Sequence, residues 1–400
     1  MHEILRGGQD KNMMIFDERI IGLMYDSQKR FGMNRRIFIR QLLNGVGAYL
    51  AMKVNMDHAV MAGMPASPST GELNYRPLNG LCLRNIAKKK LHHAGDGIFK
   101  NPMGVRNHRN LVQLLNWKLC QPNHFSKYLN EEPVKTVHIN WNEIKQKKGV
   151  AITFLKHACV VIKDDDSLMA VDPLFNDITF FIKDFTPFAP ESFIVPRMDH
   201  VLITHGHYDH LDKPTLASFP GDTHVISPLG YGDIFKSLQM NHTHALDWFD
   251  VHDDGKTEIT CLPCNHWTMR NPLIGPNHSL WGAYLIRTKS GMTIFISGDT
   301  AYFDGFEQIG SEYDIDLAIF NLGAYEPRWF MAPSHMNPVE VVKAFQEIRA
   351  KKLMVVHWGT FRLGDEPVHF PPIQLKGELK KQGLLEHLID VDHGETVFLS

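Results

Sequence analysis

Four side chains that commonly bind metals stand within six residues in the run THGHYDH, residues 204–210. The run directly follows the apolar stretch Val201–Ile203, which is typical of a buried strand. Side chains alternate along an extended chain, so the first two histidines can point toward one ion. The aspartate and the third histidine turn toward a second position. The spacing therefore predicts a site for two metal ions at the end of a strand.

Chance is the simplest alternative, because the chain contains 23 histidines and a single His-x-His pair could be accidental. Two ligand pairs in one loop are harder to explain in this way. A buried neutral histidine normally needs one partner, whereas four adjacent ionisable groups would repel or desolvate one another unless a cation held them. The type of ligand and the position at a strand end both favour a metal site.

Three further candidates, His266, Asp299 and His357, each stand at the C-terminal end of an apolar, strand-like run. Taken singly, each would be assigned a structural role, since a Gly-Asp-Thr turn such as the one at Asp299 is common. Their shared placement at strand ends favours metal binding instead. We expect them to complete the coordination begun by residues 204–210.

The predicted metal ligands divide into two sets, one with three ring nitrogens and one with two ring nitrogens and a carboxylate. The first set is His205, His207 and His266, and the second is Asp209, His210 and His357. Asp299 can bridge the sets with one oxygen to each ion. The seven ligands leave one shared position for water.

Several predicted elements would position these ligands. Residues 150–162 are expected to form a strand pair, and residues 168–173 a strand that ends at Asp172. This carboxylate can either orient a ligand histidine or cap a turn. Residues 337–348 predict a helix with an asparagine cap and proline in its first turn. His335 precedes the positive end of that helix, which favours binding of an anion.

The order of the motifs, His-x-His-x-Asp-His followed by His, Asp and His, resembles the metallo-β-lactamase superfamily of binuclear hydrolases. The resemblance implies an α/β (α+β) fold, a four-layer αββα sandwich, here with an N-terminal extension. It also implies two Zn²⁺ ions per chain.

A narrower resemblance is carried by GAYEPRWFM at residues 323–331 and VHWGTF at residues 356–361. Both runs are similar to those of N-acylphosphatidylethanolamine-hydrolysing phospholipase D. Shorter matches extend the resemblance from about residue 95 to the C-terminus. They are FKNP at 99–102, PCNHW at 263–267, LWG at 280–282 and GDTAY at 298–302.

This resemblance implies hydrolysis of N-acylphosphatidylethanolamine, a membrane lipid, to N-acylethanolamine and phosphatidic acid. The residues permit that chemistry independently. A water shared by two cations becomes hydroxide near neutral pH, and paired metals can neutralise the attacking and leaving oxygens of an in-line displacement at phosphorus. We expect Asp209 and Asp299 to act in catalysis, Asp209 by holding the hydroxide in line. His335 matches a histidine near the family's active site, and we expect it to position substrate or protonate the leaving group.

The loop at residues 323–331 is the candidate substrate-binding segment. A cation beside large apolar side chains suits a phosphate headgroup attached to acyl chains. The predicted substrate-binding residues are Tyr325, Arg328, Trp329, Phe330 and Met331. The alternative is that the three large apolar residues belong to the core and Arg328 pairs with Glu326 or another carboxylate.

Composition excludes some other classes of protein. The formal net charge of -2 gives no general basic surface for nucleic acid, so we expect no nucleic-acid partner. The basic clusters Lys88–Lys90 and Lys145–Lys148 could touch anionic lipid headgroups or could be solvated surface. Five cysteines give no disulfide framework, and Cys261 and Cys264 are expected to pack in the core.

We expect three segments: an N-terminal segment at residues 1–75, a helical and loop extension at 76–148, and the catalytic domain at 149–400. The chain's 44% hydrophobic content suits a large core. In the extension, residues 111–119 predict a helix that packs its leucine face on the core. The catalytic domain would act at a membrane surface, and the family resemblance implies a homodimer.

The N-terminal segment has two readings. Residues 34–40, NRRIFIR, resemble a twin-arginine export signal and precede an apolar stretch at 41–52, which would place the protein in the periplasm. The competing reading is an amphipathic helix on the protein or on a membrane, with the protein in the cytoplasm. No apolar run is long enough to span a bilayer.

The metal ligands alone leave other functions open. The same site could hydrolyse another phosphodiester or a lactone, and the fold could also persist in a non-catalytic lipid-binding protein. The run at residues 323–331 favours a lipid substrate. The complete ligand set favours an enzyme.

Overall fold

The computed structural model describes residues 74–105, 113–114, 116–128, 132–179, 182–186, 188, 192, 194–271 and 273–399. The twin-arginine-like motif at residues 34–40 and the apolar stretch that follows it lie outside the described residues. All structural statements below concern the described part of the chain.

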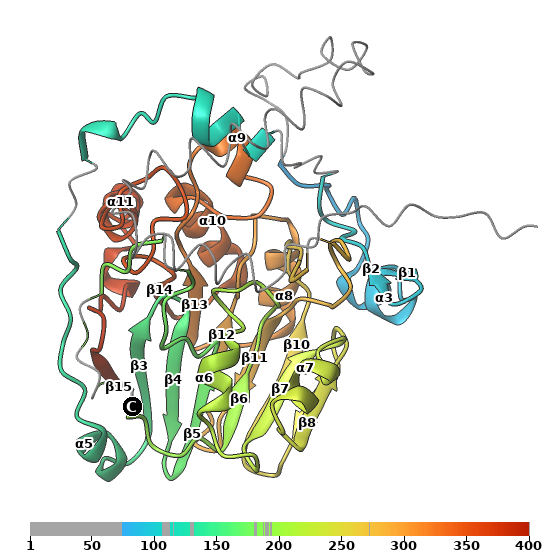
Figure 1. Cartoon of the computed structure of the whole chain (residues 1–400), viewed down its shortest axis with the longest axis vertical. Helices are drawn as coiled ribbons and strands as arrows, with labels where there is room; N and C mark the ends of the chain where they lie inside the picture. The colour runs from blue at the N-terminus through green and yellow to red at the C-terminus, as the bar shows by residue number, and fades with distance from the viewer. Residues whose placement is uncertain are drawn as a thin grey trace, which may run out of the picture. The chain divides into compact units, whose positions relative to one another are not determined.

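The first of two large sheets has seven strands and carries the N-terminal half of the fold (Figure 1). In spatial order its strands are β15 (Thr396–Leu399), β3 (Val150–Lys156), β4 (Cys159–Asp164), β5 (Ser167–Val171), β6 (His200–Leu202), β7 (His224–Pro228) and β8 (His242–Leu246). Strands β15 to β5 pair antiparallel, and β5 to β8 pair parallel. The C-terminal ends of β3, β5, β6 and β7 consequently meet at one edge.

The second sheet has six strands. In spatial order they are β14 (Lys352–Val356), β13 (Leu317–Asn321), β12 (Thr293–Ile296), β11 (Ala283–Arg287), β10 (Glu258–Leu262) and β9 (Val251–Asp253). Strands β12, β13 and β14 are parallel, and β10 runs in the same direction because β11 is antiparallel to both of its neighbours. The C-terminal ends of β10, β12 and β14 therefore also share an edge.

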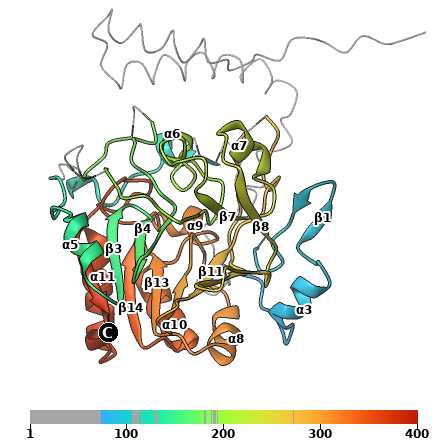
Figure 2. The same cartoon turned by 90° about the horizontal axis from the view of Figure 1, so that it is seen from below.

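Helices cover the outer face of each sheet. In Figure 2 the helices α6 (Lys213–Ala217) and α7 (Gly232–Ser237) lie outside the first sheet, and α8 (Gly305–Glu312) and α10 (Pro338–Ile348) lie outside the second. Helix α11 (Phe370–Lys381) packs beside α10. The order helix, sheet, sheet, helix confirms the predicted four-layer αββα sandwich.

Smaller elements precede or connect these layers. They are α3 (Leu83–Lys88), β1 (His93–Gly95), β2 (Ile98–Phe99), a π-helical turn (Asn116–Cys120), a 3₁₀ turn (Ser126–Tyr128), α5 (Trp141–Gln146), α9 (Arg328–Met331) and a second 3₁₀ turn (Leu385–His387).

The sequence pattern explains why the strands pack on both faces. In β6, Leu202 joins the core cluster between the sheets, while its neighbour Val201 joins the cluster beneath α6 and α7. Because helices or a second sheet cover both faces, such strands are continuous apolar runs rather than alternating ones. The predicted helix at residues 337–348 is confirmed as α10, whose cap Asn337 forms a capping box with Glu340.

Two local predictions differ from the structure. Strand β10 ends at Leu262, before Pro263, because proline cannot donate to the sheet ladder; His266 therefore follows in a non-strand segment. Of the leucines predicted to pack on the core from the helix at 111–119, Leu114 is described and is exposed, whereas Trp117 in the same segment is buried. The indole Nε1 of Trp117 donates to Asp365 Oδ2 at 3.0 Å.

Candidate metal centre

Four predicted ligands meet between the ends of β6, β10 and β12, with one ligand atom from each within 4.8 Å of the others. His205 Nε2 lies 2.9 Å from His207 Nδ1, which lies 3.3 Å from His266 Nε2. Asp299 Oδ2 is 3.8 Å from His205 Nε2 and 3.9 Å from His266 Nε2. The structure thus brings together the predicted three-nitrogen set and Asp299.

A second group of four surrounds Asp209, again with ligand atoms within 4.8 Å of one another. Asp209 Oδ2 lies 3.0 Å from His157 Nε2, and 3.6 Å from both His210 Nε2 and His357 Nε2. Three of these residues form the predicted second set. His157 is an addition that the sequence interpretation missed.

Asp299 stands between the two groups. Its Oδ2 is 3.2 Å from His210 Nε2, and its Oδ1 is 3.3 Å from His357 Nε2. The amide of Asn321 donates to Oδ1 at 2.8 Å and fixes the carboxylate. This position suits the predicted bridging role, because each oxygen faces histidines of the second group while Oδ2 also faces the first.

Neighbouring residues hold the ligands in place. Asp172 Oδ2 lies 2.7 Å from His210 Nδ1, and Asp172 Oδ1 accepts a hydrogen bond from Thr204 N at 2.7 Å. Of the two roles considered for Asp172, the structure therefore shows contact with a ligand histidine. Gly206 leaves no room for a side chain, because an added Cβ would lie 2.8 Å from the Tyr231 ring.

Burial and charge set the protonation of the two groups. Burial lowers the pKa of His207 to about 4 and that of His157 to about 3. Burial would raise the pKa of Asp209, but His210 and other histidines outweigh it and hold that pKa well below its usual value. Neutral imidazole and ionised carboxylate are the forms that bind metals.

The buried ring nitrogens provide a test of whether a metal fits. His210 Nε2 and His357 Nε2 are buried and make no hydrogen bond with any described residue. Both face Asp299. A borderline cation such as Zn²⁺ binds where ring nitrogens converge with carboxylates and have no hydrogen-bond partner. The residues therefore fit a metal centre.

His157 escaped the sequence interpretation because it sits in the two-residue turn between β3 and β4, not in a histidine-rich loop. Its backbone is left-handed, with φ of 52°, and its N–H donates to Thr360 Oγ1 at 2.8 Å. The available signal was its position: like the other ligands, it follows the C-terminal end of a buried strand.

His335 lies beside the centre. Its Nδ1 is 3.9 Å from Asp299 Oδ2, and its ring centroid is 5.5 Å from that of His266. The preceding residue anchors the segment, since Ser334 Oγ accepts a hydrogen bond from Trp267 Nε1 at 3.0 Å. His335 therefore lies beside Asp299 and His266, two of the predicted metal ligands.

The candidate substrate-binding residues are arranged around α9, just before His335. Trp329 and Phe330 are half-buried and pack with the buried Met331, Ala324 and Trp117. We call the group the apolar cap; it comprises Trp117, Ala324, Trp329, Phe330, Met331 and Leu363. Tyr325 is buried in the main core, and its hydroxyl donates to Gln374 Oε1 at 2.7 Å.

Arg328 has a carboxylate partner. Its Nη2 lies 2.7 Å from Glu340 Oε2, and its Nη1 donates to the carbonyl oxygens of Tyr325 at 3.1 Å and His335 at 3.0 Å. The guanidinium consequently ties α9 to α10 and to the backbone of His335. The alternative stated from the sequence was that Arg328 pairs with Glu326 or another carboxylate, and Glu340 is that other carboxylate.

Comparison with known proteins agrees with this geometry. Residues 169–358 match the family model of the β-lactamase superfamily domain. The chain is 28% identical over 327 residues to N-acyl-phosphatidylethanolamine-hydrolyzing phospholipase D 1 of Caenorhabditis elegans, covering 74% of this chain and 91% of that protein. It is 32% identical over 253 residues to the mitochondrial N-acyl-phosphatidylethanolamine-hydrolyzing phospholipase D of Saccharomyces cerevisiae, covering 60% of this chain and 53% of the yeast protein.

Solved structures share the fold. A possible metal-dependent hydrolase from Veillonella parvula superposes with a TM-score of 0.52 at 15% identity, over 63% of this chain and 100% of that chain. Igni18, a metallo hydrolase from Ignicoccus hospitalis, gives a TM-score of 0.50 at 18% identity, over 63% of this chain and 98% of that chain. The family match, the strand-end ligands and the αββα layers together support a metallo-β-lactamase superfamily protein that resembles N-acylphosphatidylethanolamine-hydrolysing phospholipase D.

Proposed function

We propose that this metal-dependent hydrolase cleaves N-acylphosphatidylethanolamine to N-acylethanolamine and phosphatidic acid. The observation that carries the proposal is the continuity between the apolar cap and the metal centre. Met331 of the cap and His335 beside Asp299 are four residues apart, and His335 N donates to Met331 O at 3.0 Å. A lipid phosphodiester needs such a place for its acyl chains next to its reacting phosphorus. Relatives bearing that activity in their names support the same substrate.

We further propose two Zn²⁺ ions per chain. His205, His207 and His266 would hold one, the group around Asp209 would hold the other, and Asp299 would contact both. When bound, the two cations would acidify a water near neutral pH and offset charge on the phosphodiester oxygens. Imidazole and carboxylate ligands suit zinc.

The protein's own residues would place the reacting groups. Asp209, held by His157 at 3.0 Å, can accept a hydrogen bond from the attacking water and keep it in line with phosphorus. His335 Nδ1 lies 3.9 Å from Asp299 Oδ2, and His335 can donate a proton to the oxygen of the N-acylethanolamine leaving group. These roles require the water and the leaving oxygen to lie on opposite sides of phosphorus.

Arg328 would act mainly through other residues. Because Glu340 and two backbone carbonyls already occupy its guanidinium, a phosphate contact would have to share the side chain with them. We propose that Arg328 fixes the backbone at His335. Direct contact between Arg328 or Tyr325 and the headgroup remains a prediction.

The apolar cap is also the proposed membrane-facing surface, with Trp329 and Phe330 as its contacts. Among the described residues, no helix has the length and apolar character needed to cross a bilayer.

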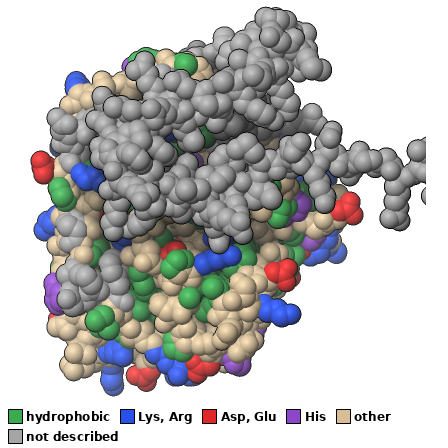
Figure 3. Space-filling view, viewed as in Figure 1, with side chains coloured by type: hydrophobic (Ala, Val, Ile, Leu, Met, Phe, Trp, Pro, Cys, Tyr) green, Lys and Arg blue, Asp and Glu red, His purple; other side chains and the backbone are tan. Residues whose placement is uncertain are grey.

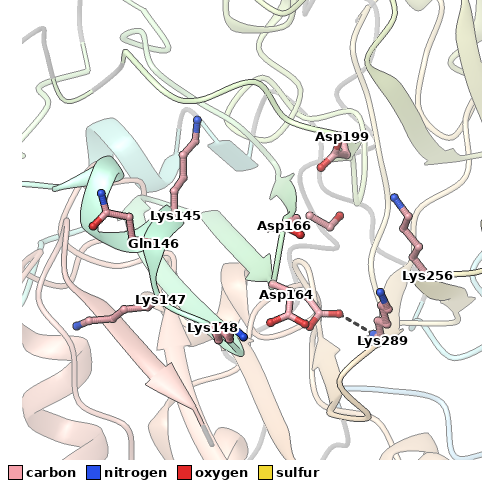
Figure 4. Close-up of a pocket in the computed structure, with 11 residues that line it drawn as sticks. Lys145, Gln146, Lys147, Lys148, Asp164, Asp166, Asp199, Lys256 and Lys289 are labelled. Atoms are coloured by element: carbon pink, nitrogen blue, oxygen red, sulfur yellow. Dashed lines mark hydrogen bonds between the residues drawn. The ribbon is translucent and has the colours of Figure 1, made fainter.

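The basic cluster at Lys145–Lys148 is a weaker candidate for the membrane-facing surface. It lines a pocket of about 440 Å³ together with Asp164, Asp166 and Asp199, as Figure 4 shows, so carboxylates offset its charge. Along the lower edge of the face in Figure 3, acidic and basic side chains are interspersed.

A substrate panel tests the proposal. Purified protein of measured metal content would be incubated with N-acylphosphatidylethanolamine in mixed micelles, a soluble nucleotide diester and a lactone, with products identified by mass spectrometry. We expect the micellar lipid to yield N-acylethanolamine and phosphatidic acid. Turnover of the diester or lactone by protein that leaves the lipid intact would assign a different hydrolase. Lipid binding without any turnover would indicate a non-catalytic protein.

The homodimer implied by the family resemblance is part of the proposal. Light scattering on the eluting protein would give its mass directly. We expect twice the 45.7 kDa of a single chain.

A further inference from the structure

Five histidines and Asp254 gather at the opposite strand ends from the metal centre. His200, His224 and His242 are the first residues of β6, β7 and β8, and they stand side by side in register. His244 follows two residues later in β8. His252 comes from β9 in the other sheet. We call this group the histidine cluster; it comprises His200, His224, His242, His244 and His252.

These imidazoles face the space between the sheets. Residues alternate in direction along a strand, and Leu202 and Ile226, two residues beyond His200 and His224, belong to the inter-sheet core. Ile259, the cross-strand partner of His252, belongs to the same core cluster. Histidines thus occupy positions that elsewhere on these strands are apolar. Polar groups in such positions cost free energy unless they have partners.

Four of the rings form a closed loop. The centroid of His224 is 5.7 Å from that of His200 and 5.5 Å from that of His244. His252 completes the loop, at 4.2 Å from His244 and 5.9 Å from His200. The three histidine rings of the first metal group are 4.7 to 5.2 Å apart, so the loop is similar but slightly wider. His242 stacks outside it on His224, at 5.0 Å.

The ring nitrogens have the character of ligands. His224 Nδ1 and His244 Nε2 are 3.3 Å apart, which is about the edge of a tetrahedron of nitrogens around Zn²⁺. His200 Nε2 lies 3.3 Å from Asp254 Oδ2, while its Nδ1 is buried without a partner among the described residues. This is the carboxylate–histidine arrangement that leaves the second nitrogen for a metal. His252 Nε2 is likewise buried and lacks a hydrogen-bond partner in the described chain.

A third compact group, His92, His93 and Asp247, provides a contrast. His92 Nε2 and His93 Nε2 lie 2.5 and 2.8 Å from the Asp247 carboxylate, and Lys90 Nζ lies 2.5 Å from it. Lys90 and the two histidines already neutralise that carboxylate, so the group is explained as a structural network, although His92 Nδ1 is also buried without a hydrogen-bond partner among the described residues. In the histidine cluster, the ion-pair partner of Asp254 among the described residues is His200, and no described lysine or arginine is paired with it.

We propose that His200, His224, His244 and His252 bind one borderline divalent metal ion such as Zn²⁺, and that this ion ties the two sheets together. Asp254 orients His200. Four imidazoles with no open position suit a structural site rather than a catalytic one. In the compact groups, all ligand atoms lie within 4.8 Å of one another, whereas the four ligand atoms of the histidine cluster do not. Metal binding would therefore draw these four rings closer together.

Zinc stoichiometry of the full-length protein tests the proposal without reference to turnover. Wild type, His224→Gln/His244→Gln and the matched control His242→Gln would be dialysed against Zn²⁺ and analysed for metal content. We expect the double variant to bind one equivalent less than wild type, and the control to match wild type. Asp254→Asn should weaken binding of that equivalent roughly 10- to 100-fold.

Anomalous diffraction at the zinc edge from wild-type crystals grown with Zn²⁺ gives a decision even if the double variant does not fold. A peak among the four rings supports the proposal. The absence of a peak at that position between the sheets would overturn the proposal. Equal zinc content in wild type and in a folded double variant would also overturn it. Neither outcome depends on the substrate assigned to the metal centre.

Discussion

At the residue scale, Asp299 is the group on which both halves of the metal centre depend. It is 3% exposed and lies within 3.9 Å of ring nitrogens from both groups. Its ionised form is favoured because burial, which would raise the pKa, is outweighed by His210 and the other nearby histidines.

Replacing Asp299 with asparagine should remove the shared negative charge while keeping the side chain's size. We expect metal affinity to fall at least roughly 100-fold and lipid turnover to be lost. Asp314→Asn, at a position whose side chain is 84% exposed, is the matched control. Full metal content and activity in Asp299→Asn would show that the bridging role is wrong.

His335 should separate catalysis from metal binding. Because it lies near Asp299 but belongs to neither compact ligand group, His335→Gln is expected to keep the metal content of wild type. If its proton serves the leaving group, kcat should fall roughly 10²- to 10⁴-fold with KM little changed. Metal analysis and steady-state kinetics measure both quantities. Loss of metal would assign His335 to the coordination sphere, and unchanged kcat would exclude the proton-transfer role.

At the element scale, α9 and the segment that follows it join the apolar cap to the metal centre. Trp117 packs on Phe330 with ring centroids 4.8 Å apart, so the extension before β3 contributes to the cap. No sequence pattern pointed to this contact, because the two segments are more than two hundred residues apart in the chain. This contact and the hydrogen bond to Asp365 together account for the burial of Trp117.

The cap should matter for a lipid and not for a soluble diester. We expect Trp329→Ala/Phe330→Ala to raise KM for micellar substrate roughly 10- to 100-fold, since burying the remaining exposed area of these two half-buried side chains would together be worth about 1.5–3 kcal/mol. Kinetics on a soluble phosphodiester should be unchanged, and Ile373→Ala, an exposed apolar residue on α11, is the control. An equal effect on both substrates would indicate damage to the centre instead of a lipid contact.

The loop before α9 is held by Glu366, whose carboxylate accepts hydrogen bonds from Tyr325 N and Glu326 N, both at 3.0 Å. Burial raises the pKa of Glu366 to about 7. The pKa of Glu366 is higher in the folded state than in the unfolded state, where it is near 4.5, so the folded state holds the proton more tightly. The carboxyl therefore stabilises the fold most at pH values below 4.5. That contribution is lost as pH rises through about 7.

Urea unfolding at pH 4.5, 6 and 8 tests this linkage. We expect wild type to lose roughly 3 kcal/mol at most across that range from Glu366. Glu366→Gln should be less stable at low pH, because an amide cannot accept both hydrogen bonds, and its stability should change less with pH. Parallel pH profiles for the two proteins would contradict the assignment.

At the scale of the whole molecule, two sheets bring their strand ends to one edge, and this is why the ligands could be predicted. Each of His205, His266, Asp299 and His357 closely follows an apolar run, and the αββα layers make those ends converge. His157, which was missed, also follows a buried strand, but it stands alone in a two-residue turn and not in a histidine-rich loop. The Glu340 partner of Arg328 could not be named, because the two residues meet only when α9 and α10 fold together.

The histidine cluster shows the same limit at the other end of the strands. His200, His224 and His242 begin three strands and are spread over more than forty residues, so only their parallel register brings them together. Local spacing can reveal ligands that share a loop. It does not reveal histidines that begin neighbouring strands, because these become a group only when the pairing of the strands is known.

The product that receives an oxygen atom from solvent shows which bond of the phosphodiester is cleaved. Hydrolysis of N-acylphosphatidylethanolamine would be run in H₂¹⁸O, and both products would be analysed by mass spectrometry. Attack at phosphorus predicts one ¹⁸O in phosphatidic acid and none in N-acylethanolamine. Label in N-acylethanolamine would exclude attack of water at phosphorus, and release of neither product by fully metal-loaded protein would exclude the lipid as the substrate.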